Sequence, residues 1–569
     1  MAAPTPQPRA APQNVPMAWI GKQPAWLLAL ATVLALLPFA GKPFNIDDPL
    51  FIWTAQHIHA HPLDPYGFNV NWYGYDLSMS ATTQNPPLAC YYLALVGGIF
   101  GWSEFTLHTA FLLPGIAAVV GTYRLAMHLC KRALLAAFLA LFTPVFLLSS
   151  TTLMCDVMML AFWVWALIFW MEGTQRERAA PLALAAILIA LASLTKYFGA
   201  CLIPLVAAWS IRRKQPVREW LGWLAIPVLA LAAYQLITKA LYGHGLLTGA
   251  GAYATAIHKS SILLNLNFVL VALTFTGGCL ATATFFAPML WTGRSLLIGA
   301  VSSLAVAAIL FLAIRSTLPA HAGALEITQI LVWAAGGISL IALAIADFHR
   351  QRDADSLLLG CWMLGTFAFT AFFNWTVNGR SILPMAIPAA ILVARRLEQR
   401  ESAGVKYPWR LLLMPALAGG VLAIWVTTAD YFFASAPPIA ARAIQSAYGD
   451  KNHRIWFQGH WGFQYYMQQN GATPLDLQKL GLTEGDYVAM PSGNSNVYPL
   501  KEPMVELETF SIPPFGSLTT MNEDAGAGFY ASLWGALPFA FGPNTGQSVT
   551  VFAYDPAGEL LKATREKKP

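Results

Sequence analysis

Charged residues are scarce in this chain. Lys, Arg, Asp and Glu together make up 11% of its 569 residues, whereas hydrophobic residues make up 57%. Soluble globular domains carry roughly 25% charged residues, so the composition excludes an ordinary soluble protein and indicates a multi-pass membrane protein. The net charge of +6 comes from basic residues in short clusters between apolar runs, which does not indicate a nucleic-acid partner.

Cysteine is equally sparse, with six residues scattered through the apolar part of the chain. None of them forms a CxxC pair or another metal-binding spacing. Cys361 is the last of the six. An exported domain formed by the remaining residues would therefore fold without disulfides.

Long apolar runs are what the chain has instead. Between residues 25 and 429, runs of roughly 16–28 residues alternate with short polar links, and each run is close to the ~20 residues that span a bilayer. Residues 1–24 are rich in Pro and Ala and predict a disordered cytoplasmic tail. Residues 430–569 have the composition of a globular domain. They are predicted to form a small α/β domain with strands near 454–459, 486–491, 505–510 and 549–554.

Basic clusters orient the predicted spans. They fall in alternate links, as "CKRA", "TQRERA", "RRKQPVRE", "HRQRD" and "ARRLEQR". The positive-inside rule places these links in the cytoplasm and gives about thirteen spans, provided that residues 86–101 form a helix at the outer interface. The first extracytoplasmic loop is then 42–104, the C-terminal domain is extracytoplasmic, and the expected location is the cytoplasmic (inner) membrane.

Five segments carry a resemblance to a known family. They are, in order, "IDDPLFIWTAQHI", "NPPLACYYLALVGGIFGWSEFTLHTAFL", "TTLMCDVMMLAFW", "ASLTKYFGACLIPLV" and "NWTVNGRSILPMAIPAAILVARRLE". Their order and spacing resemble the polyprenyl-phosphate-sugar-dependent glycosyltransferases of the GT-C fold. This group includes the protein O-mannosyltransferases and the transferase that adds aminoarabinose to lipid A. The resemblance covers most of residues 25–400 and implies an all-α polytopic fold.

The resemblance implies transfer of a sugar from a polyprenyl-phosphate donor to a hydroxyl acceptor, with inversion, on the extracytoplasmic face. Asp47 matches the first acid of the family's acidic pair and is expected to be the general base. Asp48 stands where the family usually has Glu, and is expected to orient the acceptor or a metal. Alternatively, either acid caps the helix predicted to begin at Pro49.

Two cations are expected to hold the departing phosphate, because negative charge develops on it in the transition state. Lys196 and Arg380 lie at the outer edges of apolar runs within family-like motifs, although each could instead snorkel to the interface. Asp156 is expected to orient Lys196 or help coordinate a metal, or else to cap a helix. Asn85 is expected to shape the outer loop near the donor.

The expected partners are the donor lipid, a glycan, lipid or protein acceptor, and membrane lipids. No cofactor is assigned, although the resemblance leaves a divalent metal ion open. The three histidines of "HIHAHP" are not assigned to a metal, because residues at i and i+2 do not share a helix face. The alternative function is a transporter or flippase of a lipid-linked substrate. Transporters more often place their ionisable residues at the membrane midplane, whereas here they gather toward one face.

Overall fold

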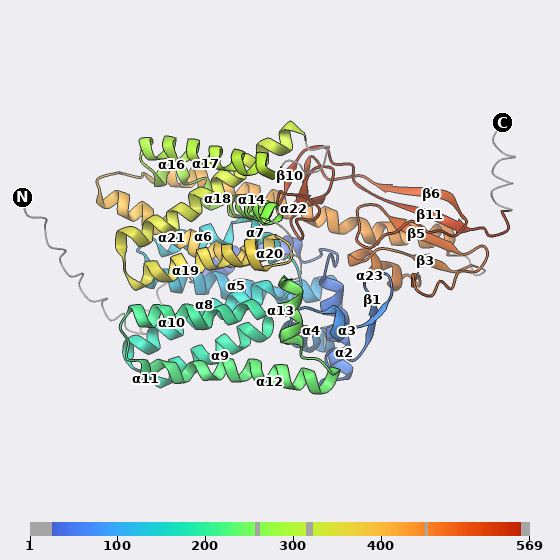
Figure 1. The fold of residues 1–569 in the computed structure, drawn as a ribbon, viewed down its shortest axis with the longest axis horizontal. Helices are drawn as coiled ribbons and strands as arrows, with labels where there is room; N and C mark the ends of the chain where they lie inside the picture. Colours follow the sequence, from blue (N-terminus) through green and yellow to red (C-terminus); the bar gives the residue numbers. More distant parts are fainter. Residues whose placement is uncertain (1–24, 256–261, 315–322, 450–452, 559–569) are drawn as a thin grey trace, which may run out of the picture.

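Helices in this chain form a bundle that carries a small β-rich region at one end (Figure 1). The structure is a computed structural model, and it describes residues 25–255, 262–314, 323–449 and 453–558. The expected tail at 1–24 lies outside these residues. Seven of the described helices are long and apolar enough to cross a membrane, and five shorter apolar helices accompany them. The chain is therefore a multi-pass membrane protein, while the expected number of about thirteen spans stays a prediction.

The bundle is built from two stretches of helix, one before and one after α13 (Leu246–Thr255). The first stretch comprises α1 (Ala25–Leu36), η2 (Leu37–Phe39), α5 (Glu104–Leu129), α6 (Ala133–Leu141), α7 (Pro144–Ser149), α8 (Asp156–Arg176), α9 (Ala179–Thr195), η3 (Tyr197–Cys201), α10 (Leu202–Arg212), α11 (Val217–Trp220), η4 (Leu221–Leu224) and α12 (Ala225–Tyr242).

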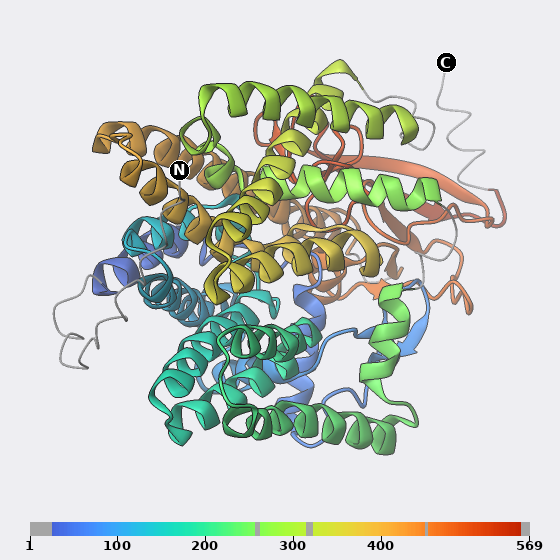
Figure 2. The same ribbon diagram turned by 60° about the vertical axis from the view of Figure 1, so that its left-hand side comes forward.

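The second stretch comprises α14 (Ile262–Cys279), α15 (Ala281–Thr284), α16 (Ala287–Leu290), α17 (Gly293–Ile314), α18 (Ala324–Gln351), α19 (Ala354–Ala368), η6 (Phe369–Phe373), α20 (Gly379–Ile382), η7 (Leu383–Met385), α21 (Ala386–Ser402) and α22 (Trp409–Tyr448). In Figure 2 these green to orange helices lie beside the blue-green helices of the first stretch. Many side chains on α12, α17 and α22 are apolar and exposed, as expected for surfaces that face lipid.

Basic links gather at the end of the bundle opposite the sheet, where α10 and α11 lie in Figure 1. Arg213 Nη2 lies 3.0 Å from Asp355 Oδ1, which joins the α10–α11 link to the start of α19. Arg132 pairs with Glu401, which joins the α5–α6 link to the end of α21. These ion pairs place links that are far apart in sequence at one end, as the alternation of the basic clusters predicts.

The loop at 42–104 lies at the other end of the bundle. It contains α2 (Asp48–Ala60), the hairpin of β1 (Asn69–Asn71) and β2 (Asp76–Ser78), α3 (Met79–Thr82) and α4 (Leu88–Phe100). Helix α4 has 13 residues, so it is about 20 Å long and shorter than a ~30 Å hydrocarbon core. This length agrees with the expected interfacial helix.

A five-stranded mixed sheet with the order β4-β3-β5-β11-β6 forms the core of the C-terminal region. Its strands are β3 (Ile455–Phe457), β4 (Thr473–Pro474), β5 (Tyr487–Pro491), β6 (Met504–Ile512) and β11 (Gln547–Tyr554), with α23 (Trp461–Gln469) after β3. Strands thus occur at all four segments expected from the sequence. Short pairs of β7 (Leu518–Thr519) with β10 (Ala540–Phe541) and of β8 (Met521–Asn522) with β9 (Ala527–Gly528) shape the 513–546 segment.

Helix α22 passes without a break through the expected domain boundary at residues 429 and 430. Figure 1 shows this orange helix extending from the bundle toward the sheet. The amino-acid composition changes at Asp430, but the helix does not end there. It also continues through Pro437 and Pro438, although proline usually kinks or breaks the interior of a helix. The bundle and the C-terminal region therefore share one continuous helix.

A buried ion pair joins the two regions. Lys42 Nζ lies 2.5 Å from Asp430 Oδ2, and neither side chain is exposed. Tyr530 donates to the same carboxylate at 2.8 Å, and Thr520 donates to its other oxygen at 2.9 Å. Each charge is thus paired and hydrogen-bonded, as buried charges require. This cluster fixes the 513–546 segment against the end of the bundle.

Candidate functional site

Asp47 stands at a turn that the backbone adopts with strain. The preceding Ile46 has a φ of +50°, a region that β-branched residues rarely enter. Such a conformation costs on the order of 1–3 kcal/mol and persists where the surroundings hold it. Asp47 is the residue before α2, but its side chain does not cap that helix. It faces Arg380 instead.

Asp48 holds this turn. Its Oδ2 accepts a hydrogen bond from the Asn45 amide at 3.0 Å, and its own amide donates to the Asn45 carbonyl at 3.0 Å. Its Oδ1 accepts from the Leu153 amide at 2.9 Å, which ties the turn to the segment just before α8. Asp48 is fully buried, and that burial raises its pKa from 3.8 to about 7. Both of its oxygens therefore serve backbone groups.

Arg380 and Asp47 form an ion pair across 333 positions of sequence, with 2.9 Å between Nη2 and Oδ2. Their side chains are 16% and 28% exposed, so the pair is partly open to a ligand. Arg380 lies on α20, where the side chain of Asn378 accepts from the Ser381 amide and caps the helix. This cap fixes the short helix that carries the guanidinium.

Asp156 and Lys196 form a second ion pair, between the first residue of α8 and the residue after α9. Asp156 does not cap α8, and its carboxylate is 2% exposed. Asn85 lies next to this pair, because its Oδ1 is 3.6 Å from the sulfur of Cys155. Arg380 Nη1 lies 2.6 Å from the sulfur of Met154, two residues before Asp156, so the two ion pairs lie close together.

Two atoms of this cluster lack partners. Among the residues that the structure describes, Arg380 Nε and Asp156 Oδ2 are buried and make no hydrogen bond. An unmet buried polar group costs about 1–3 kcal/mol. A ligand with an anionic group and hydroxyls can supply both the missing acceptor and the missing donor. No group of three or more metal-ligating side chains occurs among the described residues.

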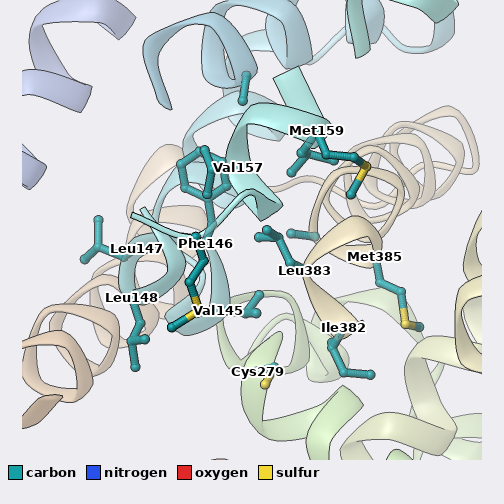
Figure 3. Close-up of a cluster of buried hydrophobic side chains, with 14 of the residues drawn as sticks. Val145, Phe146, Leu147, Leu148, Val157, Met159, Cys279, Ile382, Leu383 and Met385 are labelled. Atoms are coloured by element: carbon teal, nitrogen blue, oxygen red, sulfur yellow. The ribbon is translucent and has the colours of Figure 1, made fainter. Parts of the chain in front are cut away.

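A packed apolar core lies beneath the helices that carry these side chains. Figure 3 shows Val145 to Leu148 of α7, Val157 and Met159 of α8, Cys279 of α14, and the segment from Ile382 to Met385 meeting in one cluster. Each labelled side chain is at most 1% exposed. Because interiors pack densely, the elements that carry Asp156 and Arg380 hold a fixed spacing.

The 513–546 segment covers α20 from the other side. The Gly379 amide donates to the Phe529 carbonyl at 2.7 Å, and the Ser532 amide donates to the Val377 carbonyl at 2.8 Å. A Cβ atom on Gly379 would lie 2.4 Å from the Phe529 ring. The residue before Arg380 must therefore be small for this contact to form.

The structure brings together the six residues expected from the sequence, in two ion pairs with Asn85 and Asp48 beside them. Their catalytic and binding roles stay predictions. The sequence did not single out three residues that lie at this end of the bundle, Lys42, Asp430 and Tyr73. Burial and the charge of Asp47 raise the pKa of Tyr73. The positions of Lys42 and Asp430 in the sequence could have indicated a buried ion pair, since an ionisable residue at the edge of an apolar run is costly unless it is paired.

Residues 84–238 match the family described as dolichyl-phosphate-mannose-protein mannosyltransferase. That stretch contains Asn85, Asp156 and Lys196. This match confirms the resemblance to polyprenyl-phosphate-dependent glycosyltransferases. The members of the matched family are enzymes that transfer sugars. No curated protein matches the chain.

Three solved structures are similar in architecture. The archaeal oligosaccharyltransferase AglB from Archaeoglobus fulgidus, solved with an inhibitory peptide and a dolichol-phosphate, is 13% identical with a TM-score of 0.47, over 83% of this chain and 70% of its own. ArnT from Cupriavidus metallidurans bound to undecaprenyl phosphate is 14% identical with a TM-score of 0.42, over 82% and 93%. The arabinofuranosyltransferase AftD from Mycobacteria is 14% identical with a TM-score of 0.38, over 94% and 41%.

Proposed function

We propose that this protein is a GT-C glycosyltransferase that moves a sugar from a polyprenyl-phosphate donor to a hydroxyl acceptor on the extracytoplasmic face of the cytoplasmic membrane. The observation that carries the proposal is the pairing of Asp47 with Arg380 beside the Asp156–Lys196 pair. A base and two cations converge from distant segments at one end of a membrane bundle. The family match over residues 84–238 supports the same reaction.

The proposed step is a single displacement. The acceptor hydroxyl gives its proton to Asp47 as its oxygen bonds to the anomeric carbon. The bond between that carbon and the phosphate oxygen breaks on the opposite face, so the configuration inverts and the polyprenyl phosphate leaves with the electron pair. The leaving phosphate has a second pKa near ~6, so no general acid is needed to protonate it.

Arg380 links the two halves of this step. One of its terminal nitrogens donates to Asp47, while its Nε has no partner among the described residues. The same guanidinium can thus meet the phosphate while it orients the base. Lys196 supplies the second positive charge, and Asp156 holds it in place. A divalent metal stays open as a partner of the phosphate.

Turnover in detergent tests the proposal. Purified protein is mixed with a panel of polyprenyl-phosphate sugars and acceptors, and released polyprenyl phosphate is measured. We expect Asp47→Asn to lower the rate about 10²–10⁴-fold, the usual contribution of a general base, while the thermal unfolding midpoint stays near that of the wild type. Gln469→Asn, an exposed change on α23, is the matched control.

A glycosyltransferase turns over without a membrane gradient. A flippase in detergent has no bilayer across which to move lipid, so it releases no polyprenyl phosphate. Full activity in Asp47→Asn would refute the assignment of the base. Movement of labelled lipid by the wild type in vesicles, with no release of polyprenyl phosphate from any donor, would favour the transporter.

A further inference from the structure

A pocket lies outside the ion-pair site, between the first outer loop and the C-terminal region. Its cavity volume is about 450 Å³, and its wall comes from α2, the β1–β2 hairpin, α23 and β4. This volume falls within the ~300–1,000 Å³ typical of small-molecule sites. Neither the sequence motifs nor the proposed chemistry accounts for it.

The wall of the pocket combines aromatic rings with amides. Trp53 and Phe68 are half-buried rings, and Gln56, Asn71 and Gln468 contribute side-chain amides. Trp53 is held edge to face against Trp72, with 6.2 Å between the ring centroids. Phe68 packs at 4.8 Å from the ring of His57. The rings are therefore fixed in place before any ligand arrives.

Two side chains in this wall have unpaired polar atoms. Within the described part of the chain, His57 Nε2 and Asn71 Oδ1 are buried and make no hydrogen bond. Asn71 is 9% exposed and donates through its Nδ2 to the Leu475 carbonyl at 3.1 Å, so its orientation is set. Each unmet group costs about 1–3 kcal/mol, which a ligand that supplies the partner recovers.

The charge of the pocket narrows the class of ligand. None of the described lining residues is Lys or Arg, which argues against a phosphate or another anion. The one acid, Asp76, accepts from the Asn69 amide at 2.8 Å. The four lining amides argue against a lipid chain, because each would lose its hydration in an apolar complex.

Burial and the neighbouring His61 lower the pKa of His57. The imidazole is then neutral near pH 7, and its Nε2 either donates or accepts according to the tautomer. A hydroxyl group can match both cases, because it is both donor and acceptor. Asn71 Oδ1 needs a donor, which a hydroxyl also provides.

We propose that this pocket binds a sugar ring of the acceptor, and hence that the acceptor is a glycan. Hydroxyls of the sugar meet Asn71 and His57, and its C–H face packs on Trp53 or Phe68. The identification of this sugar as the acceptor rests on the proposed function. The binding of carbohydrate to the pocket does not depend on that function.

Helix α2 connects the pocket to the ion-pair site. It begins at Asp48, next to Asp47, and reaches the pocket wall at Trp53. Five residues of α-helix rise by roughly 7.5 Å. A glycan of a few units can therefore occupy the pocket while its terminal hydroxyl meets Asp47.

Binding without donor tests the pocket. Saturation-transfer NMR is run on the full-length protein in detergent with maltotriose, cellotriose, mannotriose and arabinotriose, and with a serine-containing tetrapeptide as the protein-type probe. Gln468→Trp fills the pocket from an exposed position, and Gln469→Trp, the next exposed residue on α23, is the matched control. We expect at least one trisaccharide to bind, and roughly tenfold or greater weakening in Gln468→Trp alone, which corresponds to about 1.4 kcal/mol.

A second pair of variants guards against misfolding. His57→Ala removes an unpaired polar atom of the wall, whereas His59→Ala changes an exposed histidine of the same helix outside the pocket. Weaker binding in His57→Ala and unchanged binding in His59→Ala supports the proposal. Equal binding in all four variants, binding of the tetrapeptide in place of the sugars, or no binding by any trisaccharide overturns it.

The two proposals fail in different ways. Sugar transfer by the wild type with no trisaccharide binding refutes the pocket and leaves the enzyme. Pocket-dependent trisaccharide binding with no release of polyprenyl phosphate from any donor supports the pocket and refutes the enzyme.

Discussion

Asp156 and Lys196 allow a structural role to be separated from a catalytic one. Lys196→Met leaves the 2%-exposed carboxylate of Asp156 without its counter-charge. Breaking a buried pair costs ~3–5 kcal/mol, and we expect a value near the lower limit because Lys196 is 22% exposed. The double variant Asp156→Asn/Lys196→Met should regain most of the lost stability, since no charge is left unpaired.

Turnover should behave differently from stability in these variants. The double variant still lacks the cation for the leaving phosphate, so its rate should stay as low as that of Lys196→Met. The thermal unfolding midpoint and polyprenyl phosphate release are measured on the same preparations. A double variant that regained both would reduce Lys196 to a partner of Asp156.

The buried carboxyl group of Asp48 should make the stability of the folded protein depend on pH. Its pKa rises from 3.8 to about 7 on folding, so the folded state holds the proton more tightly than the unfolded state. This contribution to stability is full below pH 3.8 and is lost as pH rises to about 7. Relative to Asp48→Asn, which has no proton to lose, the unfolding midpoint of the wild type should therefore fall over that range. A difference that is constant with pH would contradict the prediction.

The four charged residues selected from the sequence form the two ion pairs, as expected for charges near the ends of apolar runs, where an unpaired charge is costly. The pairing of Asp47 with Arg380 could not be read from the sequence, since 333 positions separate the two residues. Asp48 shows the same limit. Its sequence position predicts a residue that orients the acceptor or a metal, whereas the hydrogen bonds that its two oxygens accept from backbone amides depend on a contact with Leu153 that the sequence does not indicate.

At the scale of elements, the 513–546 segment positions α20. Gly379→Ala should push α20 away from Phe529, because the new Cβ would lie 2.4 Å from an aromatic ring that has little freedom to move. Arg380 follows in the chain, so its guanidinium would shift relative to Asp47. A misplacement near 1 Å can cost about 10²-fold in rate.

Relief of this contact provides the control. Phe529→Leu in the Gly379→Ala background makes room for the Cβ and keeps the backbone hydrogen bond from residue 379 to the Phe529 carbonyl. We expect turnover to recover in the double variant, measured as release of polyprenyl phosphate. If Gly379→Ala alone is as active as the wild type, the 513–546 segment does not set the position of Arg380.

Elements with strong local signals were predictable, and those set by distant contacts were not. Strands β3, β5, β6 and β11 consist of short runs rich in Val, Ile, Tyr and Phe, so their sequence alone indicates them. The stretch 528–542 is unusually apolar for a loop, which taken alone favours contact with the membrane. Much of it is buried against the bundle, where Tyr530 reaches Asp430 and Phe541 meets Gln329. Such docking depends on partners that are more than 90 residues away.

The whole molecule has two chemically different ends. The basic links around Arg213 and Arg132 occupy one end, while the sheet and both proposed sites lie at the other. The cytoplasmic leaflet attracts Lys and Arg, and long apolar helices hold the two ends apart across the bilayer. In the reaction that we propose, the donor lipid lies in the outer leaflet beside Arg380 and Lys196, and the glycan acceptor approaches from the aqueous side.

This arrangement predicts which positions an impermeant reagent reaches. In a cysteine-free variant that retains turnover, Arg218→Cys lies in the basic link before α12, and Gln469→Cys lies on α23 beside the sheet. Both positions are exposed, so burial does not limit either reaction. We expect a membrane-impermeant maleimide to modify position 469 in intact spheroplasts, and position 218 only after the membrane is permeabilised. The reverse pattern would place both ion pairs in the cytoplasm and refute transfer on the extracytoplasmic face.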